Sequence, residues 1–153
     1  MKYLSPRLAP AGPQISLFNE LAKSNNEDVI FASNTSSLSI TALQEKIQFP
    51  ERVVGMHFFN PPYLMQLVEI VKGSQTIDAV IMAIVDICKQ MGKVAVICND
   101  VPGFIVNRVA RHYYLEALKI TGEGIASFEE IDSILEASGF RMGPFKLMDL
   151  IGM

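Results

Sequence analysis

Apolar residues along the chain follow two alternating spacings up to about residue 100. Short continuous or alternating apolar runs are typical of strands, whereas recurrence every three or four residues is typical of amphipathic helices. The expected strands are 29–32, 52–59, 64–71 and 94–98. The expected helices between them are 15–22, 38–47 and 77–91. Residues 1–13, which carry three prolines and no periodicity, are expected to be irregular.

Beyond residue 100 only helical spacing follows. The expected helices are 103–120, 128–137 and 144–151. Ser127 with Glu130 fits a capping box, and Pro144 suits the first position of its helix. Strands that alternate with helices and then give way to helices alone predict an α/β sheet domain over 1–99, followed by an all-helical unit over 100–153.

Composition and charge narrow the class of protein. The 153 residues suffice for about one domain, half of them are apolar, and 19% are charged. The net charge of −3 comes without any basic run, so nucleic acid is not an expected partner. Glu69, Lys72 and Asp78 interrupt the most apolar region, which leaves no stretch of roughly 18 to 20 apolar residues for a membrane span.

Two cysteines and the opening segment bear on the compartment. Cys88 and Cys98 lie in apolar segments without metal-ligand spacing, so we expect buried free thiols, with a disulfide as the alternative. The first residues lack the apolar run of a secretory signal. A reducing compartment, the cytoplasm, is the expected location.

Polar residues at the ends of expected strands are the first candidates for a site. Residues 33–37 (Ser-Asn-Thr-Ser-Ser) follow a strand and precede a helix, so they either cap that helix or bind a polar ligand. Asn107 follows the apolar run 104–106 in an expected helix, so its amide is expected on a buried face, bonded to a ligand or to the protein itself.

His57 and Glu69 lie in two strands that flank the breaker 60–62 (Asn-Pro-Pro). His57 is either a proton acceptor or a core histidine bonded to backbone. Glu69 lies in an apolar run, where a carboxylate needs a partner unless it lies on an edge strand or the surface. If the two strands pair, Glu69 orients one ring nitrogen and leaves the other for substrate.

Five segments together resemble, in order and spacing, the L-3-hydroxyacyl-CoA dehydrogenases, including the bacterial 3-hydroxybutyryl-CoA type. They are 34–38 (Asn-Thr-Ser-Ser-Leu), 55–61 (Gly-Met-His-Phe-Phe-Asn-Pro), 67–69 (Leu-Val-Glu), 100–108 (Asp-Val-Pro-Gly-Phe-Ile-Val-Asn-Arg) and 142–145 (Met-Gly-Pro-Phe). The resemblance implies the C-terminal part of a Rossmann-like NAD-binding domain followed by an incomplete helical domain. Members commonly dimerise through that helical domain, so a homodimer is one expected assembly.

The same resemblance implies an activity and residue roles. The activity is NAD-dependent interconversion of a 3-hydroxyacyl-CoA and a 3-ketoacyl-CoA, as in fatty-acid oxidation or butyrate-type pathways. The histidine matching His57 removes the hydroxyl proton, and the glutamate matching Glu69 orients it. The remaining implied catalytic residues are Ser36 and Asn107, near the substrate oxygen, and the implied cofactor-binding residues are Asn34, Ser36 and Asn60.

The sequence departs from the family at both ends. No G-x-G-x-x-G loop is present for the cofactor pyrophosphate, and Ala9, Pro10, Ala11 and Gln14 stand where relatives carry a Glu and a Lys that contact the cofactor. Residues 150–153 are expected to end the chain part-way through a helix. We therefore expect a fragment with weak NAD binding and weak or no turnover. The alternative is a non-catalytic truncated domain that at most binds acyl-CoA or a partner.

Overall fold

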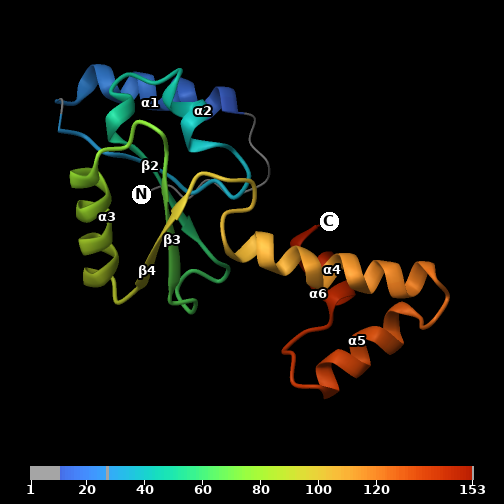
Figure 1. Ribbon diagram of the computed structural model, residues 1–153. Coiled ribbons are helices and arrows are strands. Elements are labelled where there is room, and N and C mark those ends of the chain that lie inside the picture. Colours follow the sequence, from blue (N-terminus) through green and yellow to red (C-terminus); the bar gives the residue numbers. More distant parts are fainter. Residues whose placement is uncertain (1–10, 27, 153) are drawn as a thin grey trace. The chain divides into compact units, whose positions relative to one another are not determined.

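The computed structural model describes residues 11–26 and 28–152, and it divides the chain into two compact units, Met1–Ile105 and Val106–Met153. The division lies a few residues beyond the expected change of architecture near residue 100. Elements of the first unit, in chain order, are α1 (Ala11–Ser24), β1 (Phe31–Ser33), α2 (Ile40–Gln44), a 3-10 turn (Pro50–Arg52), β2 (Val53–Phe58), β3 (Leu67–Lys72), α3 (Asp78–Gln90) and β4 (Val94–Asn99) (Figure 1).

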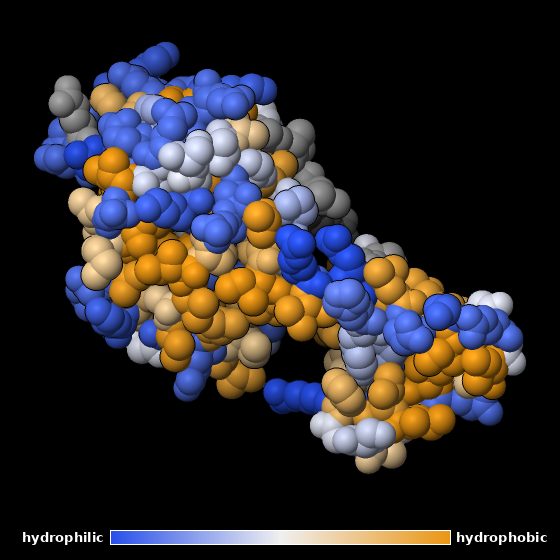
Figure 2. Space-filling view, viewed as in Figure 1, coloured by the Kyte–Doolittle hydropathy of each residue, from blue (hydrophilic) through white to orange (hydrophobic). Residues whose placement is uncertain are grey.

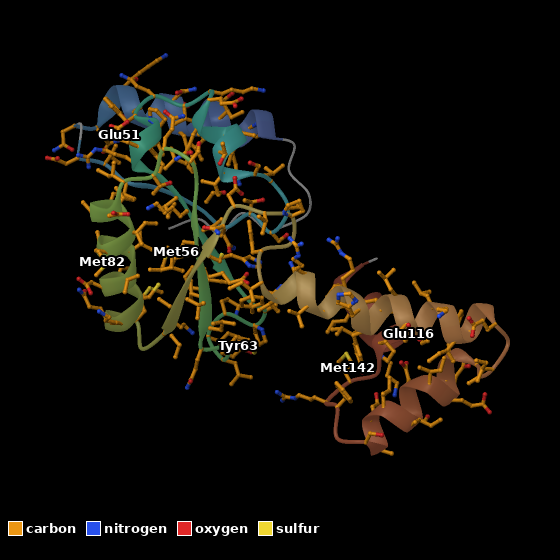
Figure 3. The ribbon with its side chains drawn as sticks, in the orientation of Figure 1. Glu51, Met56, Tyr63, Met82, Glu116 and Met142 are labelled. Atoms are coloured by element: carbon orange, nitrogen blue, oxygen red, sulfur yellow. The ribbon has the colours of Figure 1, made fainter. Side chains whose placement is uncertain are left out.

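The four described strands form one mixed sheet in the order β1-β2-β3-β4. β1 runs parallel to β2, β2 antiparallel to β3, and β3 parallel to β4. The carboxyl ends of β1 and β2 therefore share one edge of the sheet with the amino ends of β3 and β4. The loop between β2 and β3 lies at this edge and carries Tyr63, which is 86% exposed (Figure 3).

Alternating side chains on the strands build a core on each face of the sheet. One face packs against α1 and α2 and includes Phe31, Val53, Val71 and Cys98, together with Ala22, Ile40 and Leu43 from the helices. The other face packs against α3 and includes Val54, Val68 and Ile70 with the helical Val80, Ile81 and Ile84. β3 thus contributes buried residues to both faces, which explains its nearly continuous apolar sequence.

Helix α1 begins earlier than the periodicity predicts. It starts at Ala11 and places Pro13 in its first turn, where the missing proline N–H breaks no helical hydrogen bond. The prediction of irregular structure is therefore wrong for residues 11–13, and residues 1–10 lie outside the described part. The expected strand 29–32 is shifted and shorter, because β1 covers Phe31–Ser33, and Ala32 within it is exposed.

The second unit consists of α4 (Val106–Gly122), α5 (Phe128–Ala137) and α6 (Pro144–Ile151). The predicted capping box is present, with Ser127 and Glu130 each accepting from the other's backbone N–H. Buried Asp132 of α5 accepts the backbone N–H groups of Phe145 and Lys146 at the start of α6, so a carboxylate joins these two helices. The helical unit is therefore tied together by polar contacts as well as by packing.

Two helix ends differ from expectation. α4 begins at Val106 rather than residue 103, because Gly103 and Phe104 have positive φ angles of 77° and 45° that a right-handed helix excludes. α6 ends at Ile151, where Gly152 takes the left-handed conformation that closes helices. The expectation that residues 150–153 stop within a helix is therefore wrong for the residues described.

Apolar side chains gather on the face of the first unit that Figure 2 presents over β4 and α3. The outer strand β4 exposes Val94, Val96 and Ile97, each by a third or more of its surface. No helix among residues 11–26 and 28–152 is long and apolar enough to cross a membrane.

Candidate functional site

His57 and Glu69 form a buried pair across two antiparallel strands. They occupy directly opposed positions of β2 and β3, so their side chains leave the same face of the sheet. His57 Nδ1 lies 2.7 Å from Glu69 Oε2, and the two residues are 6% and 1% exposed. The pairing expected from the sequence is present, and neither a surface glutamate nor a histidine bonded only to backbone describes this site.

The second carboxylate oxygen of Glu69 is also engaged. Oε1 accepts the backbone N–H of Ile105 at 2.9 Å. If Glu69 is an ionised carboxylate, both of its oxygens act only as acceptors, and His57 Nδ1 is then the donor of this hydrogen bond. The neutral imidazole then presents Nε2 as an unprotonated acceptor, which is the form that takes a proton from an alcohol.

Hydrogen bonds from the buried Ser33 and Thr35 side chains to nearby backbone N–H groups hold the segment 33–37 together. Ser33 Oγ accepts the Thr35 N–H and donates to Gln14, while Thr35 Oγ1 accepts the N–H groups of Ser37 and Leu38. The N-cap of α2 is Ser39, whose Oγ accepts the Ala42 N–H. The capping role considered for residues 33–37 is therefore wrong, because their bonds form turns before the helix begins.

Asn34 and Ser36 alternate with these buried residues and are exposed. Asn34 Oδ1 accepts the N–H of Phe58 at 2.9 Å, which joins the end of β1 to the end of β2 next to His57. Asn60 is exposed two residues farther along the chain. The three predicted cofactor-binding residues thus lie just beyond the carboxyl ends of β1 and β2, where open α/β sheets bind ligands.

The chemistry of these three side chains can be compared with that of NAD. A hydroxyl and two amides offer neutral donors and acceptors, which fit the amide and hydroxyl groups at the nicotinamide end of the cofactor. A pyrophosphate is best bound by a positive charge or by the N-terminus of a helix. None of these three residues carries a positive charge, and none lies at the start of a helix. The residues present therefore fit the nicotinamide end of NAD.

Asn107 is the second residue of α4 and belongs to the second unit. Its side chain is exposed, so the expected burial of this amide is wrong. Arg108 beside it is exposed as well. The role that the resemblance implies for Asn107 remains a prediction.

Two cysteines lie in the cores on either side of the sheet, and both are free thiols, as predicted. Burial, with smaller contributions from the charges of Glu69 and Asp100, raises the pKa of Cys98 to about 11. Burial also raises the pKa of Cys88. Neither thiol suits nucleophilic or metal chemistry, and the described residues contain no metal-binding cluster.

Sequence reasoning missed three contributors to the site. Phe59 and Phe104 lie with their rings edge-on against the His57 imidazole, with centroid distances of 4.7 and 5.6 Å. The Ile105 backbone N–H is the third. Gly103 followed by an aromatic residue was the signal available, since glycine favours a left-handed turn that interrupts a helix.

Comparison with known proteins supplies the family. Residues 14–101 match the 3-hydroxyacyl-CoA dehydrogenase NAD binding domain, and residues 103–153 match the C-terminal domain of the same family. The mitochondrial hydroxyacyl-coenzyme A dehydrogenase of Rattus norvegicus is 45% identical over 90% of this chain, and the 3-hydroxyadipyl-CoA dehydrogenase of Escherichia coli is 47% identical over the same share. This chain covers 44% and 29% of those two proteins, so it spans less than half of their length.

A solved structure agrees with this assignment. The (S)-3-hydroxybutyryl-CoA dehydrogenase of Ralstonia eutropha superposes with a TM-score of 0.88 at 37% identity, over 97% of this chain and 52% of that one. The NAD binding domain and the C-terminal domain of the family follow one another along this chain. The chain belongs to the 3-hydroxyacyl-CoA dehydrogenase family.

Proposed function

We propose that this chain carries the proton-transfer half of an NAD-dependent 3-hydroxyacyl-CoA dehydrogenase. The buried His57–Glu69 pair is the observation that carries the proposal, because two polar groups are costly in an apolar core unless they bond each other. The proposed substrate is a 3-hydroxyacyl-CoA or a 3-ketoacyl-CoA, and the proposed metabolic role is in fatty-acid oxidation or a butyrate-type pathway.

In the proposed mechanism, His57 Nε2 accepts the proton of the substrate's 3-hydroxyl group. Glu69 holds Nδ1 and stabilises the imidazolium that forms, so the proton remains on the ring while the carbonyl is created. NAD, when bound, supplies the acceptor for the hydride that leaves the same carbon. In the reverse direction, the imidazolium returns its proton to the oxygen of the 3-ketoacyl group.

Ser36 is assigned to the substrate oxygen, and Asn34, Ser36 and Asn60 to the nicotinamide end of NAD. The exposure of the Ser36 hydroxyl supports this assignment, since within the described residues it has no protein partner and is available to a ligand. Asn34 offers its amide NH₂ in the same way, because its Oδ1 is already bonded to Phe58.

NADH oxidation by acetoacetyl-CoA tests the proposal, with His57→Gln as the variant. His112→Gln is the matched control, because His112 is the other histidine of the chain and is exposed. We expect turnover that is slow, lowered by roughly 10²–10⁴-fold but still measurable in His57→Gln, and unchanged by His112→Gln. Equal rates in wild type and His57→Gln would contradict it, and so would a wild-type chain that binds acetoacetyl-CoA without turnover, which is the behaviour of a non-catalytic domain.

We also propose a cytoplasmic location and a homodimer as the working assembly. The two free buried thiols support a reducing compartment. Fractionation by cell disruption and sedimentation tests the location, and sedimentation equilibrium of the purified chain tests the assembly. A protein found in another compartment, or a monomer at all concentrations, would contradict these two points.

A further inference from the structure

Two phenylalanine side chains pack against the His57 ring. Phe59 and Phe104 approach it at interplanar angles of 61° and 62°, the edge-to-face arrangement that aromatic rings prefer. Because the imidazole is buried and both rings pack against it, its rotation about the Cβ–Cγ bond requires these neighbours to move. The aromatic contacts therefore fix the ring orientation in which Nδ1 meets Glu69.

Phe104 is itself held in an unfavourable backbone conformation. Its φ angle is 45°, in the left-handed region that costs a bulky residue on the order of 1–3 kcal/mol. Such a conformation persists only where surrounding contacts require it. Phe104 is 3% exposed in the core that includes Ile40 and Leu43 of α2, so core packing and the imidazole together provide those contacts.

The segment Asp100–Ile105 is fastened on both sides of Phe104. On the amino side, Asp100 Oδ2 accepts the Ser39 hydroxyl at 2.7 Å and the Thr41 N–H at 2.8 Å. On the carboxyl side, the Ile105 N–H donates to Glu69 Oε1. The same short segment therefore contacts both members of the pair, the imidazole through Phe104 and the carboxylate through Ile105.

We propose that Phe104 is a positioning residue for the His57–Glu69 pair, and that Asp100 positions Phe104 by anchoring the segment to α2. Phe104 holds the imidazole in the Nδ1–H tautomer by preventing the rotation that would release Nδ1 from Glu69. The consequence for catalytic rate rests on the proposed function. The tautomer and orientation of the His57 ring do not rest on the proposed function, because they are properties of the protein without substrate.

Nitrogen-15 NMR of the two histidine rings tests the proposal on the full chain. The ring nitrogen shifts distinguish a protonated from an unprotonated nitrogen, and exposed His112 supplies an internal reference for a ring that exchanges between tautomers. In neutral to mildly alkaline buffer we expect a single Nδ1–H tautomer for His57. Phe104→Leu should move both His57 nitrogens toward the averaged shifts of His112.

Phe31→Leu is the matched control. Phe31 is buried in the same core as Phe104, 2% exposed, and its ring pairs with Phe18 rather than with histidine. This control should lose stability while the His57 shifts stay at their wild-type values. Unchanged His57 shifts in Phe104→Leu, or equal changes in both variants, would overturn the proposal.

Asp100→Ala provides a second variant if Phe104→Leu fails to fold, since it removes both bonds between the segment and α2 without altering the core. We expect its His57 shifts to move in the same direction as those of Phe104→Leu, and unchanged shifts would overturn the role of the segment. NADH oxidation measured in parallel should slow roughly tenfold in Phe104→Leu at an unaltered KM. A wild type that shows the single tautomer but no turnover would contradict the proposed function and leave the positioning intact.

Discussion

Glu69 lies directly opposite His57 in the β2–β3 pair and divides its two carboxylate oxygens between the imidazole and the backbone N–H of Ile105. The register of β2 and β3 therefore sets the distance between the imidazole and the carboxylate. The segment between β4 and α4 holds the carboxylate through its second oxygen. A site built on paired strands holds its geometry more rigidly than one carried by loops.

Replacing Glu69 by glutamine should lower the free energy of unfolding by about 1–3 kcal/mol. The amide has one acceptor oxygen, so either the His57 Nδ1–H or the Ile105 N–H faces an NH₂ group and loses its acceptor. Urea denaturation followed by circular dichroism measures the change. Glu116→Gln is the control, because Glu116 is exposed on α4 (Figure 3), and its effect should stay within about 0.5 kcal/mol. Equal stabilities of the two variants would show that the buried carboxylate is not needed.

Both cysteines should resist alkylation by iodoacetamide in the native protein. The reactive species is the thiolate, and burial raises the pKa of Cys98 to about 11 from the 9.0 of an unfolded chain. Mass spectrometry after labelling with and without urea counts the modified thiols. Native labelling as fast as labelling in urea, at either thiol, would contradict the burial described.

The raised pKa of Cys98 also predicts a loss of stability at alkaline pH. Between 9.0 and about 11 the unfolded chain releases this thiol proton while the native protein retains it. The native state then binds more protons, so the free energy of unfolding falls as the pH rises through this window. Denaturation midpoints of wild type and Cys98→Ala, compared across the window, should show a smaller alkaline decline in the variant.

Gly143→Ala should destabilise the helical unit by roughly 2–3 kcal/mol. A Cβ at this position would overlap the carboxylate and the backbone of Asp132, the residue that caps α6. Hydrogen exchange of the α5 and α6 amides measures the loss. Gly122→Ala is the control, because a Cβ there meets nothing within 4 Å, and this change should be neutral or slightly stabilising. Similar exchange rates in the two variants would contradict the close approach.

The sheet and the pair were predictable from the sequence because local patterns and tertiary packing agree there. β3 is apolar except for Glu69 and its flanking Lys72, and a breaker of three residues separates it from β2, so a paired glutamate and histidine follow from elementary cost arguments. Residues 128–137 and 144–151 were predicted as helices at their observed bounds, since a capping box and an N-terminal proline mark their starts.

The segment before α4 was not predictable in the same way. Pro102 and the apolar residues after it imitate the first turn of a helix, yet Phe104 adopts a left-handed conformation that only its contact with His57 and its burial explain. Asn107 was expected on a buried face because the apolar residues 104–106 before it suggest the buried side of a helix. Such features depend on contacts between residues that are distant in sequence, and the hydrophobic periodicity of a sequence does not indicate those contacts.

The most direct test of the account is a double-mutant cycle on NADH oxidation by acetoacetyl-CoA, with His57→Gln, Glu69→Gln and the double variant. Glu69 acts only through His57, so its removal should cost nothing further once the imidazole is gone. We predict that the double variant is no slower than His57→Gln. Rate losses that multiply would show that the two residues act independently and would contradict the account.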